Sequence, residues 1–385
     1  MRFEFATATR IIFGEGTLNE VAPLASQMGR RALVVVGKDT LRAVPLLERL
    51  KEHRIEYSTF SVDGEPTIDI ITHGISLARK FKCDIVIGIG GGAVLDTGKA
   101  ISAMMTNSGS LLDYLEIIGR GKPLTEQSTP YIAIPTTSGT GSEVTRNAVI
   151  ASAEHRVKVS LRSPLILPKI AVIDPQLTDT MPQNITASTG LDALTQLIEP
   201  YVSVKANPLI DGICTEGMEL AASSLRRAYE KGDDRIARRN MSLSSLFGGL
   251  ALANAGLGAV HGFAGTIGGI FKNASHGAIC ARLLPCVIEA NLSALRERMP
   301  QSPVLERYEK IAQILTGNAS AKADDCVAWT RDISTAMNIA PLSAFGISEN
   351  DFPDIVNSAK KSSSMKGNPI GLMEEELRLI LEKAL

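Results

Sequence analysis

The sequence predicts an α/β domain in the N-terminal half of the chain and an all-helical domain after it. Short apolar runs alternate with helix-like segments as far as Asp174. Two loops rich in glycine and hydroxyl side chains directly follow two of these runs. From about Asn184 onward the pattern is helical, and no later run resembles a buried strand. A chain of 385 residues is long enough for two domains, each with its own core.

The N-terminal half contains five apolar runs that are separated by helix-like segments. Continuous apolar runs of this kind are typical of a parallel sheet that is buried on both faces. A further pair of runs, on either side of Ala153–His155, is expected to form a β-hairpin over the sheet. The expected strands are Ala32–Val36, Tyr57–Val62, Asp84–Ile89, Tyr131–Ile134 and Ile170–Ile173; the expected helices are Leu41–Lys51, Ile68–Phe81 and one from Leu95; the hairpin strands are Asn147–Ser152 and Arg156–Leu161.

The character of the sequence changes after Asp174-Pro175. We therefore place the domain boundary near residue 178, with an α/β domain over 1–178 and a helical domain over 179–385. The C-terminal residues 374–385 form an amphipathic pattern that predicts a packing helix.

Composition excludes several classes of protein. Lys+Arg is 40 and Asp+Glu is 41, which argues against nucleic-acid binding, because such proteins usually carry a basic balance. Residues 240–271 carry no charged side chain, but their glycines, serines and asparagines favour buried helices over a membrane span. Five cysteines without a CxxC pair, and an N-terminus without a signal-peptide pattern, predict a cytoplasmic protein.

A glycine-rich turn between a strand and a helix is the first candidate binding site. Gly90–Gly92 place bare backbone N–H groups at a helix N-terminus, where they favour a phosphate. By spacing, Gly88, Gly90 and Ala93 fit G-x-G-x-x-A, which is a weak signal alone and falls on the third expected strand rather than the first. The alternative is a tight turn that binds no ligand.

A second loop, residues 134–150 (IPTTSGTGSEVTRNAVI), also follows a strand. Its hydroxyl side chains and two glycines suit a phosphate or a nicotinamide amide. A polar surface loop is the alternative, but two such loops in one parallel-sheet domain favour nucleotide binding.

These two loops resemble signature segments of the iron-containing (group III) alcohol dehydrogenases. The resemblance extends from IIFGEG (11–16) through residues 159–178 to HGAICARLLP (276–285) and SSMKGNPI (363–370), and so covers nearly the whole chain. It implies a dehydroquinate synthase-like fold, a nucleotide-binding α/β domain and a helical metal domain, with the active site in a cleft between them. It also implies a homodimer.

The resemblance assigns cofactor roles to individual residues. By this comparison Gly91, Gly92 and Asp96 fit the pyrophosphate loop, while Thr136, Thr137 and Thr140 fit the nicotinamide side and Lys158 matches a cofactor-contacting lysine.

The end of the first expected strand bears on the choice of cofactor. NAD-preferring relatives commonly carry an acid at the position of Gly37, where it would repel a 2′-phosphate. Here Gly37 removes that repulsion and Lys38 adds a positive charge, so we expect NADP(H) to be favoured over NAD(H). Asp39 is the counter-argument, because a shift of two positions would restore the acid.

The resemblance also implies a divalent metal, which would be iron, zinc, manganese or nickel. Asp192, His261 and His276 match three of its ligands. Gln196 stands one helical turn after Asp192, where relatives usually carry histidine, so that it could offer a carbonyl oxygen, bond a metal-bound water or leave a position open. Gly265 replaces a histidine found in many relatives near the nicotinamide, which leaves the proton path undefined.

The nearby cysteines have a simpler interpretation. Cys280 and Cys286 flank His276 in sequence, and we expect both to be buried packing residues rather than ligands.

The leading hypothesis is therefore reversible, metal-assisted hydride transfer between NADP(H) and a small alcohol/aldehyde pair. One alternative is a metal-free reductase similar to maleylacetate reductases, with Arg146 and Arg162 as candidate carboxylate binders. Others are a lyase or cyclase like dehydroquinate synthase, and a non-catalytic nucleotide-binding protein. The substrate itself is not encoded in any motif.

Overall fold

The computed structural model describes residues 2–271 and 273–385, and the chain forms two compact units. The α/β unit comprises Ala6–Thr137 and Gly141–Asp179, and the helical unit comprises the N-terminal residues to Phe5, Ser138–Thr140 and Thr180–Leu385. The segment Ser138–Thr140 groups with the helical unit, although it precedes the expected boundary near residue 178. The division into domains over 1–178 and 179–385 therefore stays a proposal.

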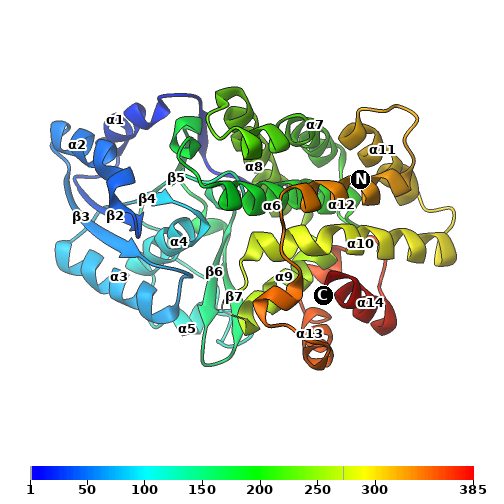
Figure 1. Cartoon of the computed structure of the whole chain (residues 1–385). Coiled ribbons are helices and arrows are strands. Elements are labelled where there is room, and N and C mark those ends of the chain that lie inside the picture. Colours follow the sequence, from blue (N-terminus) through cyan, green and yellow to red (C-terminus); the bar gives the residue numbers. More distant parts are fainter. Residues whose placement is uncertain (1, 272) are drawn as a thin grey trace. The chain divides into compact units, whose positions relative to one another are not determined.

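A six-stranded parallel sheet forms the centre of the α/β unit (Figure 1), which confirms the predicted fold class. All five expected strands belong to it. The sixth strand was not expected from the sequence, because its apolar run is only three residues long. In spatial order the strands are β1 (Arg10–Phe13), β8 (Ile170–Ile173), β5 (Tyr131–Pro135), β4 (Ile85–Gly90), β2 (Arg31–Gly37) and β3 (Glu56–Val62).

Both faces of this sheet are buried, as the continuous apolar runs predict. Along β2, Leu33 and Val35 pack into one apolar cluster, and Val34 and Val36 pack into another on the opposite face. Alternate side chains of a strand point to opposite faces, so both sets are buried only when helices cover the sheet on both sides.

Helices α1 to α5 belong to the same unit. The second begins three residues later than expected, because Asp39 caps a 3₁₀ turn over Thr40–Ala43. The expected hairpin is an antiparallel pair of strands, β6 and β7. The bounds are α1 (Val21–Ala25), α2 (Val44–Glu52), α3 (Ile68–Phe81), α4 (Gly92–Thr106), α5 (Leu111–Tyr114), β6 (Asn147–Ser152) and β7 (Val157–Arg162).

In the part of the helical unit that the structure describes, nine helices pack around one apolar cluster. Helix α6 lies at its centre, since almost every residue from Thr186 to Val202 is buried. The bounds are α6 (Gln183–Val202), α7 (Pro208–Glu230), α8 (Arg235–Ala255), α9 (Ala259–Ile270), α10 (His276–Arg298), α11 (Val304–Thr316), α12 (Ala323–Ala336), α13 (Phe352–Ala359) and α14 (Glu374–Ala384).

Helix α10 is long and apolar enough to cross a membrane, but 72% of its most apolar window is buried inside the protein. Helices α8 and α9 pass the same test only as a pair, and they are bent by 98° at their junction. Buried core helices commonly have this composition, which agrees with the interpretation of residues 240–271 as buried helices.

Candidate metal centre

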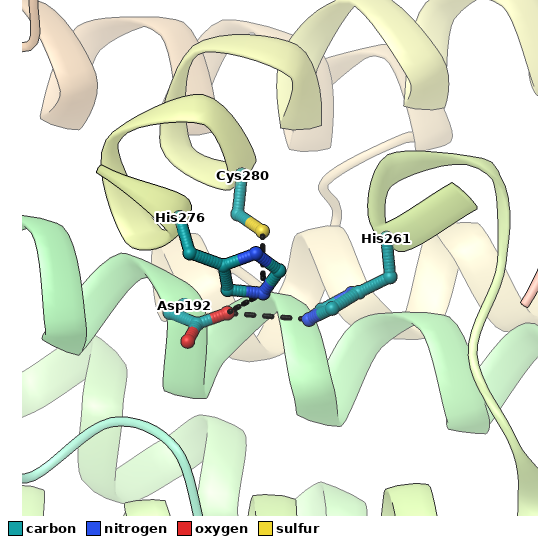
Figure 2. Close-up of side chains that lie close together, drawn as sticks. All are labelled: Asp192, His261, His276 and Cys280. Carbon is teal, nitrogen blue, oxygen red and sulfur yellow. Dashed lines mark hydrogen bonds and ion pairs between the residues drawn. The ribbon is translucent and has the colours of Figure 1, made fainter. Parts of the chain in front are cut away.

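Four side chains from three helices of the helical unit converge on one point (Figure 2). Asp192 comes from α6, His261 from α9, and His276 and Cys280 from α10. One potential ligand atom from each of the four lies within 4.8 Å of every other. The three residues expected to be metal ligands therefore lie together, although they are up to 84 positions apart in sequence.

The carboxylate of Asp192 lies between the two imidazoles. Its Oδ1 is 3.2 Å from Nε2 of His261 and 3.9 Å from Nε2 of His276. The Sγ of Cys280 lies 3.7 Å from Nε2 of His276, and the two imidazole ring centres are 5.5 Å apart (Figure 2). One carboxylate and two imidazoles whose Oδ1 and Nε2 atoms lie this close form a donor set suited to a divalent transition metal.

Glu199 fixes the orientation of His261 by contacting the ring nitrogen that faces away from Asp192. Its Oε2 lies 2.7 Å from Nδ1 of His261, and its Oε1 accepts a 2.7 Å hydrogen bond from the backbone N–H of Val260 in the first turn of α9. With Nδ1 of His261 bonded to this carboxylate, Nε2 faces the cluster, where the neutral ring would offer its lone pair to a metal ion. A carboxylate that bonds the far nitrogen of a ligand histidine is a common support of metal sites.

The cluster favours a charged pair at its centre. Burial opposes ionisation of Asp192, but its hydrogen bond to His261 and the nearby His276 outweigh burial and lower its pKa. Burial likewise opposes charge on His261, yet its interactions with Cys280, Glu199 and Asp192 raise its pKa well above the usual value. Burial raises the pKa of the Cys280 thiol to about 12.

Gln196 contributes an unsatisfied polar atom to the same region of α6. Its side chain is buried, and its Oε1 has no hydrogen-bond partner among the described residues. Leaving a buried amide oxygen unpaired costs roughly 1–3 kcal/mol. The carboxylate, two imidazoles and thiol of the cluster fit a divalent metal ion, and this unpaired oxygen belongs to the residue one helical turn after Asp192.

Helical spacing explains how the sequence builds this site. Asp192, Gln196 and Glu199 occupy positions i, i+4 and i+7, and therefore share one face of α6. His276 and Cys280 are likewise one turn apart on α10. Cys280 is buried, as expected, but its thiol also lies in the cluster, so that its interpretation as a packing residue rather than a ligand stays a prediction. Glu199 was missed, although its i+7 spacing from Asp192 was a readable signal.

Two glycines shape the surroundings of the histidines. A Cβ at Gly277 would lie 2.4 Å from the backbone oxygen of Ser188, so that α10 approaches α6 closely only because residue 277 has no side chain. A Cβ at Gly265, one turn after His261, would meet no described atom within 4 Å beyond its own helix backbone and chain neighbours. The space next to His261 on this side is therefore open.

In the α/β unit, the predicted phosphate turn lies at the N-terminus of a long helix. Gly91 is the N-cap of α4 and Gly92 is its first residue. A Cβ at Gly90 would lie 2.6 Å from the side chain of Val94, which explains the glycine there by packing alone. The backbone N–H groups at the start of α4 form an anion-binding position of the expected kind.

Asp96 joins this turn to the second loop. It accepts hydrogen bonds from Ser142 Oγ (2.6 Å) and from the backbone N–H of Val149 (2.9 Å), and Lys99 Nζ is 3.0 Å away. Lys99 is fully buried and also donates to Thr145 Oγ1 at 2.9 Å. Both oxygens of the Asp96 carboxylate are thus bonded within the protein.

The other expected cofactor residues are distributed over both units. Thr136 and Thr137 belong to the α/β unit, and Thr140 groups with the helical unit. The segment Ser138–Thr140 is bonded to α8 of the helical unit by a 3.0 Å hydrogen bond between Ser138 and Ser242. Lys158 on β7 forms a 2.9 Å ion pair with Glu65.

The residues expected to select the cofactor lie at the carboxyl end of β2. Gly37 is the last residue of the strand, and Lys38 forms an exposed 2.9 Å ion pair with Asp63. Asp39 caps the following 3₁₀ turn by accepting from the N–H of Leu41, and its other oxygen lies 3.4 Å from Arg42. The acid two positions after Gly37 is therefore already bonded to its own turn.

Comparison with known families gives one consistent result. Residues 8–175 match the iron-containing alcohol dehydrogenase family, and residues 186–385 match the C-terminal part of the Fe-containing alcohol dehydrogenase family. Together the two matches cover most of both units.

Individual relatives agree over the full length. Choline dehydrogenase of Bacillus subtilis (strain 168) is 33% identical over 98% of this chain and 94% of its own, and 1,3-propanediol dehydrogenase of Klebsiella pneumoniae is 33% identical over 99% and 98%. A crystal structure of a 1,3-propanediol oxidoreductase covers 100% of both chains with a TM-score of 0.92 and 32% identity. A sulfoacetaldehyde reductase from Bifidobacterium kashiwanohense in complex with NAD⁺ has a TM-score of 0.87 and 25% identity, over 100% of this chain and 99% of its own.

Proposed function

The chain belongs to the iron-containing alcohol dehydrogenase family, and from this premise we propose that it interconverts an alcohol and an aldehyde or ketone with NADP(H), using a divalent metal ion. Its relatives are named as dehydrogenases of alcohols, and this chain is an alcohol dehydrogenase in the same sense. The observation that carries the metal-assisted mechanism is the convergence of the buried Asp192 and His261 with the partly exposed His276.

In this proposal Asp192, His261 and His276 hold the ion, and the buried oxygen of Gln196 takes part from the next turn of α6. When bound, the ion supplies Lewis-acid catalysis, because it polarises the substrate oxygen and stabilises negative charge there. Glu199 keeps Nε2 of His261 pointing into the cluster, and the surrounding apolar core of the helical unit limits access of water.

Gly265 supports an indirect route for the proton. The space beside this residue is open, and it carries no side chain that could accept a proton. We propose that water or a ribose hydroxyl of the cofactor conducts the proton in place of the histidine found in many relatives. The same space would accommodate a substrate larger than a short alcohol.

The cofactor would bind at the amino end of α4. Backbone N–H groups at Gly91 and Gly92 suit its pyrophosphate, and the bound cofactor supplies or accepts the hydride. Asp96 would act by holding the two loops together, because both of its oxygens are engaged within the protein. Thr136, Thr137, Thr140 and Lys158 remain the proposed contacts on the nicotinamide side.

The preference for NADP(H) rests on the residues that follow β2. Gly37 offers no repulsion to a 2′-phosphate, and the acid at Asp39 is already bonded to its own turn. Lys38 is the candidate cation, although its pairing with Asp63 reduces its effect. We expect kcat/KM to be higher with NADP⁺ than with NAD⁺, and Lys38→Ala to lower the NADP⁺ value by roughly tenfold, since the hydrogen bond it would lose is charged but exposed.

Two measurements test the proposal. Steady-state oxidation of small primary alcohols should be lost after treatment with a chelator and restored by Fe, Zn, Mn or Ni. Comparison of the two cofactors, with the exposed Lys80→Ala as a control for Lys38→Ala, tests the preference. Full activity in chelator would contradict the Lewis-acid mechanism and would favour a metal-free reductase. A clear preference for NAD⁺ would contradict only the cofactor assignment.

A further inference from the structure

We propose that the thiolate of Cys280 is the fourth protein ligand of the metal centre, and that the resulting aspartate, two-histidine and cysteine site selects zinc over iron. The inference rests on the metal-dependent function proposed above and concerns which atoms hold the ion. It assigns a role to a residue that the sequence alone places in the core.

The position of the thiol is the first argument. Cys280 lies one turn after His276 on α10, and its side chain is fully buried. Its Sγ points toward the space between the two histidines and Asp192 (Figure 2). The matched comparison is Cys286 on the same helix, which is also buried, but whose Sγ lies 3.9 Å from the backbone oxygen of Arg282 and outside the cluster.

The separations between donor atoms are the second argument. Zinc bonds of about 2.0–2.1 Å to nitrogen or oxygen and about 2.3 Å to sulfur, in a tetrahedron, place nitrogen and oxygen about 3.3 Å apart and nitrogen and sulfur about 3.6 Å apart. The observed distances are 3.2 Å from Asp192 Oδ1 to His261 Nε2 and 3.7 Å from Cys280 Sγ to His276 Nε2. The distance from Asp192 Oδ1 to His276 Nε2 is 3.9 Å, so that these two atoms would move about 0.6 Å closer together on zinc binding.

The substitution at position 196 is the third argument. By the resemblance described above, relatives hold the metal with one aspartate and three histidines. Gln196 stands at the position of one of these histidines. The Oε1 of Gln196 lies 3.3 Å from the position that a Cβ of Gly248 on α8 would occupy, and an amide oxygen is a weaker ligand for a transition metal than an imidazole. Cys280, on α10, would supply the fourth protein ligand in place of that histidine.

The chemistry of sulfur then determines the metal. Thiolates favour zinc and other thiophilic ions, whereas sites made only of imidazole, carboxylate and amide oxygen are also suited to iron and manganese. Catalytic zinc can expand to five ligands, so a fourth protein ligand remains compatible with substrate binding.

X-ray absorption on the zinc-loaded full-length protein tests the inference directly, without any variant. The expected result is one sulfur scatterer at about 2.3 Å together with nitrogen and oxygen scatterers at about 2.0–2.1 Å. The cobalt-substituted protein should also show a sulfur-to-cobalt charge-transfer absorption. That band should disappear in Cys280→Ser and persist in Cys286→Ser and Gln196→Ala.

Affinity gives an independent readout. Loss of a group that only hydrogen-bonds a metal ligand lowers metal affinity by roughly 10- to 100-fold. Cys280→Ser should weaken zinc binding by more than this, while iron binding should change much less. Zinc coordinated only by nitrogen and oxygen, with equal affinity in wild type and Cys280→Ser, would overturn the inference but leave the metal-dependent function intact. Failure of the wild type to bind any of the tested metals would overturn both.

Discussion

Glu199 carries out two tasks with one carboxylate. One oxygen accepts from the first turn of α9 and the other holds the ring of His261. The helix that carries His261 and the orientation of its imidazole are thus set by the same residue. Because Glu199 is itself buried on the central helix α6, both contacts are anchored in the core of the helical unit.

Replacing this residue should therefore weaken metal binding without removing a ligand. We expect Glu199→Gln to raise the dissociation constant for the metal by roughly 10- to 100-fold, because the amide no longer fixes the tautomer and the charge of His261. Metal titration of the purified variant, beside the exposed Glu219→Gln, measures the effect. Unchanged affinity would show that the contact serves only helix packing.

A second buried acid, Glu143, lies in the loop of residues 134–150 in the α/β unit. Burial raises its pKa from 4.5 to about 7, partly offset by the charge of Lys99. The folded protein therefore keeps a proton that the unfolded chain releases between pH 4.5 and about 7. Glu143 accordingly reduces stability progressively as the pH rises through this window, and the full cost applies above it.

Glu143→Gln removes this cost. We expect the free energy of unfolding of the variant to equal that of the wild type near pH 4.5. At pH 8 it should exceed the wild-type value by at most about 3 kcal/mol, which corresponds to the rise of the Glu143 pKa from 4.5 to about 7. Urea unfolding at both pH values, with the exposed Glu154→Gln as a control, checks the sign. A variant less stable than the wild type at pH 8 would contradict this account.

At the scale of elements, the close approach of α10 to α6 brings the ligands together. Gly277 follows His276 directly and lies against the backbone of Ser188 on α6. Asp192 is one turn further along α6. The contact between the two helices therefore sets the distance between the carboxylate and the second histidine.

Gly277→Ala should push the helices apart. The added Cβ would meet backbone rather than a flexible side chain, so we expect a loss of about 1–3 kcal/mol in stability together with weaker metal binding. Gly265→Ala on α9 is the matched control, because its Cβ would meet open space and should leave stability equal or slightly higher. Thermal unfolding with and without metal compares the two. Similar behaviour of both variants would show that the helix contact does not set the site.

The elements differ in how well the sequence predicts them. Long apolar runs and periodic helices were predicted closely, and α3 and β8 have the expected bounds. Strand β1 was missed because only its pairing with β8 makes so short a run a strand. The closeness of Cys280 to the two histidines was not predicted, because one thiol beside a histidine has no distinctive pattern until α10 is placed against α6 and α9.

At the scale of the whole molecule, the family and fold were predictable because two long loops and several shorter motifs span nearly the entire chain. The donor set was predictable only in part, since it combines side chains from three helices. The substrate was not predictable, because residues that line a pocket come from scattered helices and follow no spacing rule. The expected homodimer stays a prediction, which sedimentation of the purified protein would test.

We expect the cluster of Asp192, His261, His276 and Cys280 on α6, α9 and α10 to bind a metal ion. Mass spectrometry of the purified protein, after anaerobic reconstitution with Fe, Zn, Mn and Ni separately, measures this most directly. We expect about one tightly bound ion per chain. We also expect the ion to be lost in His261→Ala and retained in His73→Ala, a histidine outside the cluster. Absence of bound metal in the wild type, or equal metal content in both variants, would contradict this expectation.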